Sequence, residues 1–202
     1  MKLYYSPGAC SLAPHIILRE GGFDFDLEKV DLGSKKTAGG EDYIRINAKG
    51  YVPALKLDDG QVLTEGAAID QYLADLKPDS GLAPKAGTME RYRLVEWLNF
   101  ISTEIHKNFG PLWRPTTPDA TKQNQRDLLA KRFDYLVAEL KGKLYLMGDR
   151  FTVADAYLYT VLNWAGMLKL DMSAWPALGE YHARVAARPK VQEALKAEGL
   201  AG

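Results

Sequence analysis

The feature that most constrains the fold is a change of pattern near residue 80. Before it, strand and helix signals alternate in the order strand, helix, strand, helix, strand, strand, helix; after it, apolar residues recur only at helical spacing. The segment between the two patterns is rich in Pro and Gly, as is typical of a linker. We therefore expect an α/β domain at residues 1–77, a linker at 78–87 and an all-helical domain at 88–202.

The first 77 residues carry the pattern of a small α/β unit. Strands are expected at 2–5, 25–30, 54–57 and 61–64, and helices at 11–21, 41–46 and 65–76. Asp58, Asp59 and Gly60 separate the last two strands, and Asp-Gly between alternating runs predicts a hairpin. Residues 33–40 are polar and rich in Gly, so we expect a loop there.

The second half shows three apolar stripes at helical spacing. They consist of Leu94, Trp97, Leu98, Ile101 and Ile105, then Leu129, Phe133, Leu136 and Leu140, then Leu178, Tyr181 and Val185. Pro111, Pro115 and Pro118 predict a break after the first helix. Residues 157–170 are apolar nearly all round, so they are expected to form the central buried helix. Thr152 and Asp155 match a capping box that starts a helix.

Composition excludes several classes of protein. Lys plus Arg and Asp plus Glu both number 26 among 202 residues, so the formal charge is zero and nucleic acid is not expected as the main partner. The one cysteine excludes an internal disulfide framework and fits a reducing compartment. No signal peptide or membrane-spanning stretch is visible, so we expect a cytoplasmic protein without a membrane partner. The three dispersed histidines do not form a metal site.

Cys10 is placed where a cysteine becomes reactive, between the end of the first strand and the start of the first helix. Free N–H groups and the helix dipole favour a thiolate at this position, so we expect a lowered thiol pKa. The alternative is an inert, buried free cysteine. An internal dithiol cycle is impossible because the chain has no second cysteine. A mixed disulfide with an external thiol remains possible.

Two further segments have both a structural and a functional interpretation. The Val52–Pro53 bond is expected to be trans from its spacing alone, whereas a cis bond would turn the backbone of Val52 outward to pair with an extended peptide. Thr64, Glu65 and Gly66 end a strand and open a helix. Capping by Thr64 is the simpler interpretation, and a carboxylate site at the helix N-terminus is the alternative.

Asn99, Thr103 and His106 are spaced i, i+4, i+7, so we expect them to share one helix face beside the apolar stripe. His106 is interpreted first as a partly buried histidine with its hydrogen bonds satisfied. Near a thiolate it would instead donate a hydrogen bond and stabilise the negative charge.

Taken together, the motifs resemble those of the cytosolic glutathione S-transferases over the whole chain. The matching segments are 1–15, 50–55, 63–66, 97–102, 104–107 and 151–155. The start, with Cys10 in place of the tyrosine or serine of other classes, is similar to the bacterial beta class. This resemblance implies a thioredoxin-like N-terminal domain and an all-α C-terminal domain.

The resemblance also implies roles for individual residues. Cys10 would face the sulfur of glutathione by a hydrogen bond or a mixed disulfide. The other implied contacts are Ser11, His106 and Lys107 near the sulfur, Val52 and a cis Pro53 along the cysteinyl part, Glu65 and Gly66 at the γ-glutamyl end, Lys35 at the glycyl carboxylate, and Asn99, Thr103 and Glu104 on the first helix of the second domain. Asn99 would reach across from the neighbouring subunit of a homodimer. Gly66 departs from the frequent serine, so its contact would use the backbone only.

The activity implied by the resemblance is conjugation of the glutathione thiolate, as co-substrate and without a metal, to hydrophobic electrophiles in a detoxifying role. Phe109, Trp113 and Trp164 are candidate wall residues for the electrophile. Two alternatives stay open: thiol transfer or peroxide reduction through a Cys10 mixed disulfide, and non-catalytic binding of hydrophobic ligands.

Overall fold

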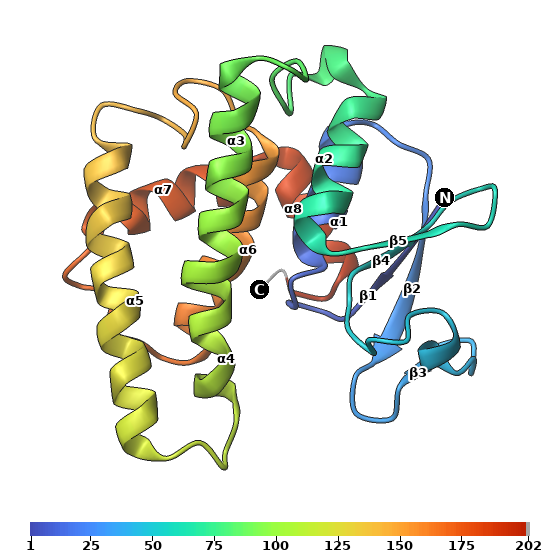
Figure 1. Ribbon diagram of the computed structural model, residues 1–202, viewed down its shortest axis with the longest axis horizontal. Coiled ribbons are helices and arrows are strands. Elements are labelled where there is room, and N and C mark those ends of the chain that lie inside the picture. Colours follow the sequence, from blue (N-terminus) through green and yellow to red (C-terminus); the bar gives the residue numbers. More distant parts are fainter. Residues whose placement is uncertain (201–202) are drawn as a thin grey trace.

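The computed structural model describes residues 1–200 and places an α/β half beside an all-helical half (Figure 1). Five strands form one sheet in the order β3-β2-β1-β4-β5. They are β1 (Lys2–Tyr5), β2 (Asp26–Asp31), β3 (Lys36–Thr37), β4 (Ala54–Lys56) and β5 (Val62–Thr64). The central strand β1 runs parallel to β2 and antiparallel to β4. The predicted combination of an α/β half and a helical half is confirmed.

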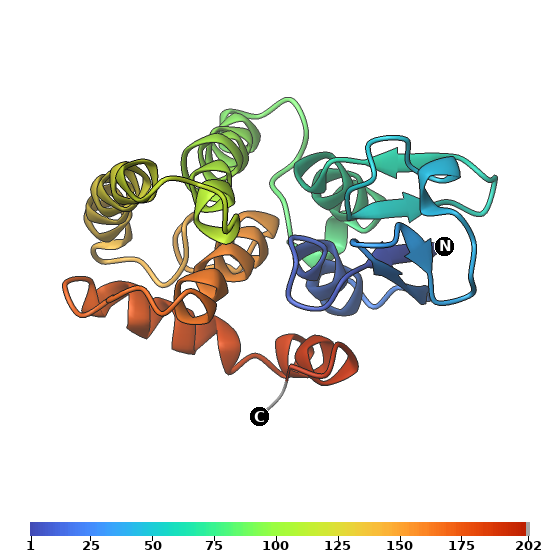
Figure 2. The same ribbon diagram turned by 90° about the horizontal axis from the view of Figure 1, so that it is seen from below.

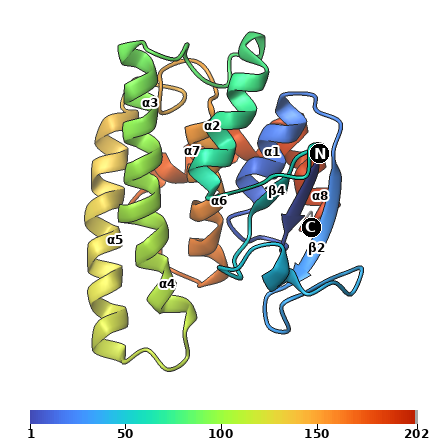
Figure 3. The ribbon, with the colours of Figure 1, turned by 45° about the vertical axis from the view of Figure 1, so that its right-hand side comes forward.

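Alternation along β1 gives the sheet two different apolar faces. Leu3 and Tyr5 join the main core, which α1 (Leu12–Glu20) and α2 (Gly66–Leu76) cover. Tyr4 faces the opposite side with Tyr43 of η1 (Tyr43–Arg45), a single 3₁₀ turn within the predicted short helix. Figure 3 shows α1 and α2 between the sheet and α6 (Val153–Met167).

Two details of the sheet bear on the sequence predictions. The predicted hairpin is confirmed, because β4 and β5 pair antiparallel with Ala54 opposite Thr64. The predicted loop at 33–40 is only partly correct: β3 lies inside it and pairs antiparallel with β2, with Val30 opposite Thr37. Two residues of edge strand are too short to leave a periodic signal in the sequence.

The helical half contains the remaining elements. They are η2 (Pro78–Ser80) in the linker, then α3 (Met89–Phe100), the π-helix η3 (Ile101–His106), α4 (Lys107–Trp113), α5 (Asp119–Leu140), α6, α7 (Pro176–Ala186) and α8 (Pro189–Ala197). The predicted central helix is confirmed as α6, which is buried along most of its length. It begins at the predicted capping box: the backbone N–H and Oγ1 of Thr152 both donate to Oδ2 of Asp155, at 2.8 and 2.9 Å.

The expected break after the first helix is confirmed at residues 114–118, which contain Pro115 and Pro118, but Pro111 does not mark it. Pro111 lies inside α4, which continues to Trp113. A proline removes one backbone donor, and here it does so in the last turn of a helix that is already anchored by the buried Phe109.

The C-terminal helix returns to the α/β half (Figure 2). α8 packs against α1, although the two helices are about 170 residues apart in sequence. Arg188 before α8 forms two hydrogen bonds with the carboxylate of Glu20 at the end of α1, at 2.7 and 2.9 Å. α1 is therefore held between α6 and α8, and its C-terminal end is fixed by Arg188. Within residues 1–200, no helix is both long and apolar enough to cross a membrane.

Candidate active site

The loop between β1 and α1 is held by hydrogen bonds to both backbone groups of Gly8. Gly8 adopts φ +70°, a backbone conformation that L side chains rarely adopt, so any other residue would be strained there. Its N–H donates to Oε2 of Glu198 at 2.9 Å, and its carbonyl accepts from Nε1 of Trp164 at 2.8 Å. Contacts from α6 and from the end of α8 therefore set the position of the loop that carries Cys10.

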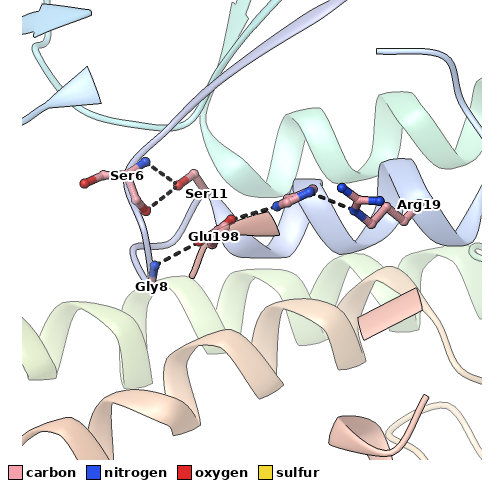
Figure 4. Close-up of polar contacts among 6 residues, drawn as sticks. Ser6, Gly8, Ser11, Arg19 and Glu198 are labelled. Carbon is pink, nitrogen blue, oxygen red and sulfur yellow. Dashed lines mark hydrogen bonds and ion pairs between the residues drawn. The ribbon is translucent and has the colours of Figure 1, made fainter. Parts of the chain in front are cut away.

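A buried chain of polar side chains extends from this loop along α1 (Figure 4). Nδ1 of His15 lies 2.8 Å from Oε1 of Glu198, and Nε of Arg19 donates to Nε2 of His15 at 2.9 Å. Because Nε2 accepts a hydrogen bond, Nδ1 carries the ring proton and donates to Glu198. The carboxylate of Glu198 is thus shared between the loop and α1.

Ser11 stabilises the same loop through hydrogen bonds with the backbone of Ser6. Its side chain is fully buried, and its Oγ accepts from the N–H of Ser6 at 3.1 Å and donates to the carbonyl of Ser6 at 3.3 Å (Figure 4). The hydroxyl is therefore engaged with the backbone, so the structure supports a positioning role rather than a direct contact with a ligand.

Cys10 is partly exposed, and its thiol is protonated. Its Sγ donates to the carbonyl of Val52 at 3.1 Å. Burial raises the pKa of the Cys10 thiol to about 12; the backbone N–H groups and Lys107 act against this rise, and the charges of Asp70 and Glu65 add to it. The expected lowering of the thiol pKa is therefore wrong for the protein without a ligand, because desolvation outweighs the start of the helix.

Val52 stands next to Cys10 at the edge of the site. The Val52–Pro53 bond is cis, as the resemblance implied and against the expectation from spacing alone. Val52 lies before β4 and outside the ladder that joins β4 to its neighbours. Its carbonyl accepts from Sγ of Cys10, and the sheet uses none of its backbone groups, so an extended ligand that displaces this contact can pair with it.

The start of α2 forms the next wall. Glu65, not Thr64, is the N-cap residue; it has φ +70°, and no side chain caps the helix. Capping by Thr64 is therefore wrong, and the first N–H groups of α2 keep the capacity to bind a carboxylate. The carboxylate of Glu65 forms an ion pair with Lys49. Gly66 has room for a side chain, since a Cβ would lie 3.9 Å from Cγ of Pro53.

His106 closes the site from the helical half. Its Nδ1 lies 2.7 Å from the hydroxyl of Tyr157, and its ring packs against Trp164 with ring centroids 4.7 Å apart. The pKa of His106 is lowered to about 4, chiefly by burial and secondly by the charge of Lys107, whereas Glu65 opposes the shift. The imidazole is therefore neutral at physiological pH.

The predicted electrophile wall is only partly exposed. Trp164 lies at the centre of an aromatic cluster, with ring centroids 5.7 Å from Phe109 and 6.4 Å from Trp113. Phe109 is completely buried and packs against the ring of Trp164, whereas Trp113 is 44% exposed. Of the three predicted residues, Trp113 presents the largest surface to a ligand.

The structure does not keep Asn99, Thr103 and His106 on one face. Asn99 and Thr103 are exposed, and Oγ1 of Thr103 donates to the carbonyl of Asn99, while His106 points to α6. The reason is η3, because a π-helix has more residues per turn than the α-helix assumed in the spacing argument. Glu104 points to α5, where its Oε2 accepts from Nε of Arg132 at 2.8 Å.

The remaining predicted residue, Lys35, lies in the segment between β2 and β3. Its Nζ donates to the carbonyl of Gly50 at 3.0 Å, and its backbone has φ +56°. This contact brings its charge to the segment that leads into Val52. Lys107 is exposed at the start of α4.

Two residues that sequence reasoning missed support the site: Tyr157, whose hydroxyl lies 2.7 Å from Nδ1 of His106, and Glu198, which accepts from the N–H of Gly8. Each acts through a contact with a segment far away in sequence, so no local motif marks it.

Other possible sites lie elsewhere or are absent from the described part of the chain. A cavity of about 470 Å³ lies between α6, α7 and α8, where Tyr159, Asn163 and His182 line it, but none of the predicted site residues does. Within residues 1–200, no three His, Cys, Asp or Glu side chains are grouped so that they could hold a metal ion.

Comparison with known proteins agrees with this geometry. Residues 8–76 match the family model described as glutathione S-transferase, N-terminal domain, and residues 100–189 match the one described as glutathione S-transferase, C-terminal domain.

Solved structures are similar over nearly the whole chain. A glutathione transferase from Methylococcus capsulatus strain Bath is 64% identical, with a TM-score of 0.97 over 98% of both chains. A sphingomonad glutathione S-transferase complexed with glutathione is 51% identical (TM-score 0.95, 99% of this chain and 100% of that one). A beta-class glutathione S-transferase from Sphingomonas chungbukensis is 50% identical (TM-score 0.95, 99% and 100%).

Proposed function

The chain belongs to the glutathione S-transferase family, and on this premise we propose how its residues bind glutathione and transfer it to an electrophile. It resembles the bacterial beta class and is an enzyme, a glutathione transferase. The reaction joins the sulfur of glutathione to an electrophilic carbon of a hydrophobic compound.

One observation carries the binding proposal: Cys10, the backbone of Val52 at its cis peptide bond and the uncapped start of α2 meet at one end of the sheet. Glutathione is an extended tripeptide with a carboxylate at each end. Its cysteinyl backbone would pair with Val52, and its γ-glutamyl carboxylate would accept from the first N–H groups of α2 at Gly66. Glu65 would take the ammonium group, and Lys35 the glycyl carboxylate.

In the proposed mechanism the thiolate forms on glutathione. The thiol loses its proton to water, the sulfur attacks the electrophilic carbon, and the leaving group departs with its electron pair. Cys10 donates its S–H to the glutathione sulfur in place of Val52, so the developing charge receives a hydrogen bond. Lys107 adds a positive charge on the same side.

His106 is the second proposed donor. The hydroxyl of Tyr157 would donate its proton to Nδ1 of His106, 2.7 Å away. Nε2 then carries the ring proton and can donate to the sulfur. Ser11 contributes by holding the loop that carries Cys10. The electrophile would pack against Trp113 and Trp164, with Phe109 beneath them.

We further propose that the protein is a homodimer. Met89 and Tyr92 on α3 and Tyr51 beside the site are large apolar side chains that are 62–69% exposed. Asn99 at the end of α3 and Thr103 in the adjoining η3 are also exposed, and from there they could reach a neighbouring subunit. Dimerisation would cover this surface.

The division into a glutathione-binding domain at 1–77 and a helical domain at 88–202, separated by 78–87, remains part of this proposal. So does a cytoplasmic location, where reduced glutathione is available to the single free thiol. Glu104 is proposed to contribute only by anchoring η3 to α5 through Arg132.

A second activity, glutathione-dependent disulfide exchange through Cys10, is favoured by one observation: the only cysteine is partly exposed beside the proposed sulfur position. Its raised pKa argues for conjugation as the main reaction, because the thiol is a poor nucleophile. A purely non-catalytic binding role is not carried forward, since the chain is an enzyme.

The experiment that separates these activities compares the wild type with Cys10→Ala. A chloronitrobenzene electrophile and a mixed-disulfide substrate are assayed side by side with glutathione. We expect conjugation to persist at a reduced rate and disulfide exchange to disappear. Loss of both activities while glutathione still binds would make Cys10 a direct participant and would overturn the proposed mechanism.

A further inference from the structure

The cavity of about 470 Å³ between α6, α7 and α8 has no role in the proposed reaction. α6 contributes to it and to the catalytic site with different residues. Nε1 of Trp164 donates to the carbonyl of Gly8 in the loop that carries Cys10, whereas the adjacent Asn163 lines the cavity. A cavity of this volume falls within the range of small-molecule sites in proteins.

The lining of the cavity favours a neutral, apolar ligand. Of the residues in 1–200 that line it, none is Asp, Glu, Lys or Arg, and most are aliphatic residues or methionines. A charged ligand would therefore lose its hydration without gaining an ion pair. Met167 and Met172 have flexible thioether side chains, which adapt to irregular shapes and make favourable contacts with aromatic rings.

A few polar groups interrupt this apolar lining. Nε2 of His182 lies 2.6 Å from Oδ1 of Asn163, and the His182 ring stacks on Tyr159 with ring centroids 4.7 Å apart. Because an amide oxygen only accepts, Nε2 carries the ring proton. Burial lowers the pKa of His182, so the ring is neutral and its Nδ1 is left as an acceptor. Nδ2 of Asn163 is a donor, so the pair suits a ligand hydroxyl, which both donates and accepts.

Two helical glycines also line the cavity, Gly166 on α6 and Gly179 on α7. A Cβ at either position would have no packing neighbour within 4 Å, and neither residue has a positive φ. Glycine weakens the interior of a helix relative to alanine. Packing and backbone conformation therefore do not require these two glycines, whereas an open route into the cavity explains both.

We propose that this cavity is a second small-molecule site, which binds neutral aromatic alcohols. The ring system lies among the leucine and methionine side chains, and the hydroxyl meets the pair of Asn163 and His182. The inference goes beyond the proposed function, because it requires neither glutathione nor catalysis. The dimer proposed above uses α3 and Tyr51, so it leaves this cavity accessible.

The test is the binding of 1-naphthol, measured by isothermal titration calorimetry without glutathione. The titrations use Trp113→Ala, which lacks the exposed residue of the electrophile wall. Adding Gly179→Leu places a large side chain in the cavity, and we expect binding at least tenfold weaker. The matched control adds Ala183→Leu, which gives the same new side chain at an exposed position of α7 outside the cavity and should bind as Trp113→Ala does.

A second series varies the ligand and tests the proposed chemistry. We expect naphthalene, which lacks the hydroxyl, to bind about fivefold more weakly than 1-naphthol. The charged 1-naphthoate should bind at least tenfold more weakly.

Unchanged binding of 1-naphthol after Gly179→Leu, in a variant shown by urea unfolding to be folded, would overturn the inference. So would the absence of binding in both Trp113→Ala and the wild type, which is also the result expected if a second copy of the chain covers the cavity. Binding by the wild type that Trp113→Ala abolishes would assign the ligand to the electrophile wall instead. Equal affinities for 1-naphthol and 1-naphthoate would overturn the preference for a neutral alcohol.

Discussion

At the residue scale, burial acts in the same direction on the two titratable side chains that face the site: it favours a neutral Cys10 and a neutral His106. Both are hydrogen-bond donors without charge in this state. The thiolate of glutathione would then be the one anion in contact with them. A site of this kind stabilises a charge on the ligand without competing for it.

The low pKa of His106 predicts a simple pH dependence. Because the pKa of His106 is near 4, the imidazole stays neutral down to about that value, so acidification from pH 8 to pH 5 should not protonate it. The conjugation rate of the wild type and of His106→Asn, measured over this range, should therefore show the same ionisations. An ionisation near pH 6.5 in the wild type that vanishes in the variant would contradict this prediction.

Some of these residues could be predicted from sequence and some could not. The resemblance brought Cys10, Val52, Glu65 and His106 together, because each lies in a local motif. The protonation of Cys10 was predicted with the wrong sign, because the start of a helix is visible in the sequence but the depth of burial is not. Tyr157 and Glu198 act through contacts with segments far away in sequence, which no local motif marks.

At the element scale, the loop between β1 and α1 depends on α8 for its position. The carboxylate of Glu198 accepts from Gly8 and from His15, which ties the end of the described chain to the loop that carries Cys10. Helix periodicity predicted where the helices lie, but it did not reveal this contact or the π-helix at η3, since both depend on neighbouring segments.

Glu198→Gln tests whether the hydrogen bonds of Glu198 to Gly8 and His15 hold the loop. The amide keeps one acceptor and loses the charge, so Gly8 or His15 loses its partner, and we expect the free energy of unfolding to fall by about 1.5–3 kcal/mol. The KM for glutathione should rise more than kcat falls, because the loop is less well held. Glu193→Gln on the exposed side of α8 is the matched control, and its ion pairs should contribute little. Equal stability of both variants in urea unfolding would contradict a stabilising role for the Glu198 hydrogen bonds.

At the scale of the whole molecule, the site lies where the two halves share one core. The α/β half supplies Cys10, Val52 and Glu65, and the helical half supplies His106 and Trp164. The division into two halves was readable from the change of pattern near residue 80. Their relative placement was not, because it rests on α1 packing against α6 and α8.

The proposed dimer is a prediction at this same scale. Sedimentation of the wild type should give twice the mass of one chain. Replacing the exposed Tyr92 by Asp should shift the population to single chains, because a charge would be buried in the interface. The matched control is Tyr135→Asp on α5, also exposed, which should leave the mass unchanged. A wild type that sediments as a single chain would refute the dimer.

The central claim is that the site stabilises the thiolate on glutathione, and a titration of bound glutathione tests it most directly. In Cys10→Ser the protein has no thiol, so every thiolate signal belongs to glutathione, and the serine hydroxyl keeps a donor beside the sulfur. We predict that bound glutathione ionises at a lower pH than free glutathione, and that the shift is larger in Cys10→Ser than in Cys10→Ala. Bound glutathione that titrates like the free tripeptide in both variants would contradict the account.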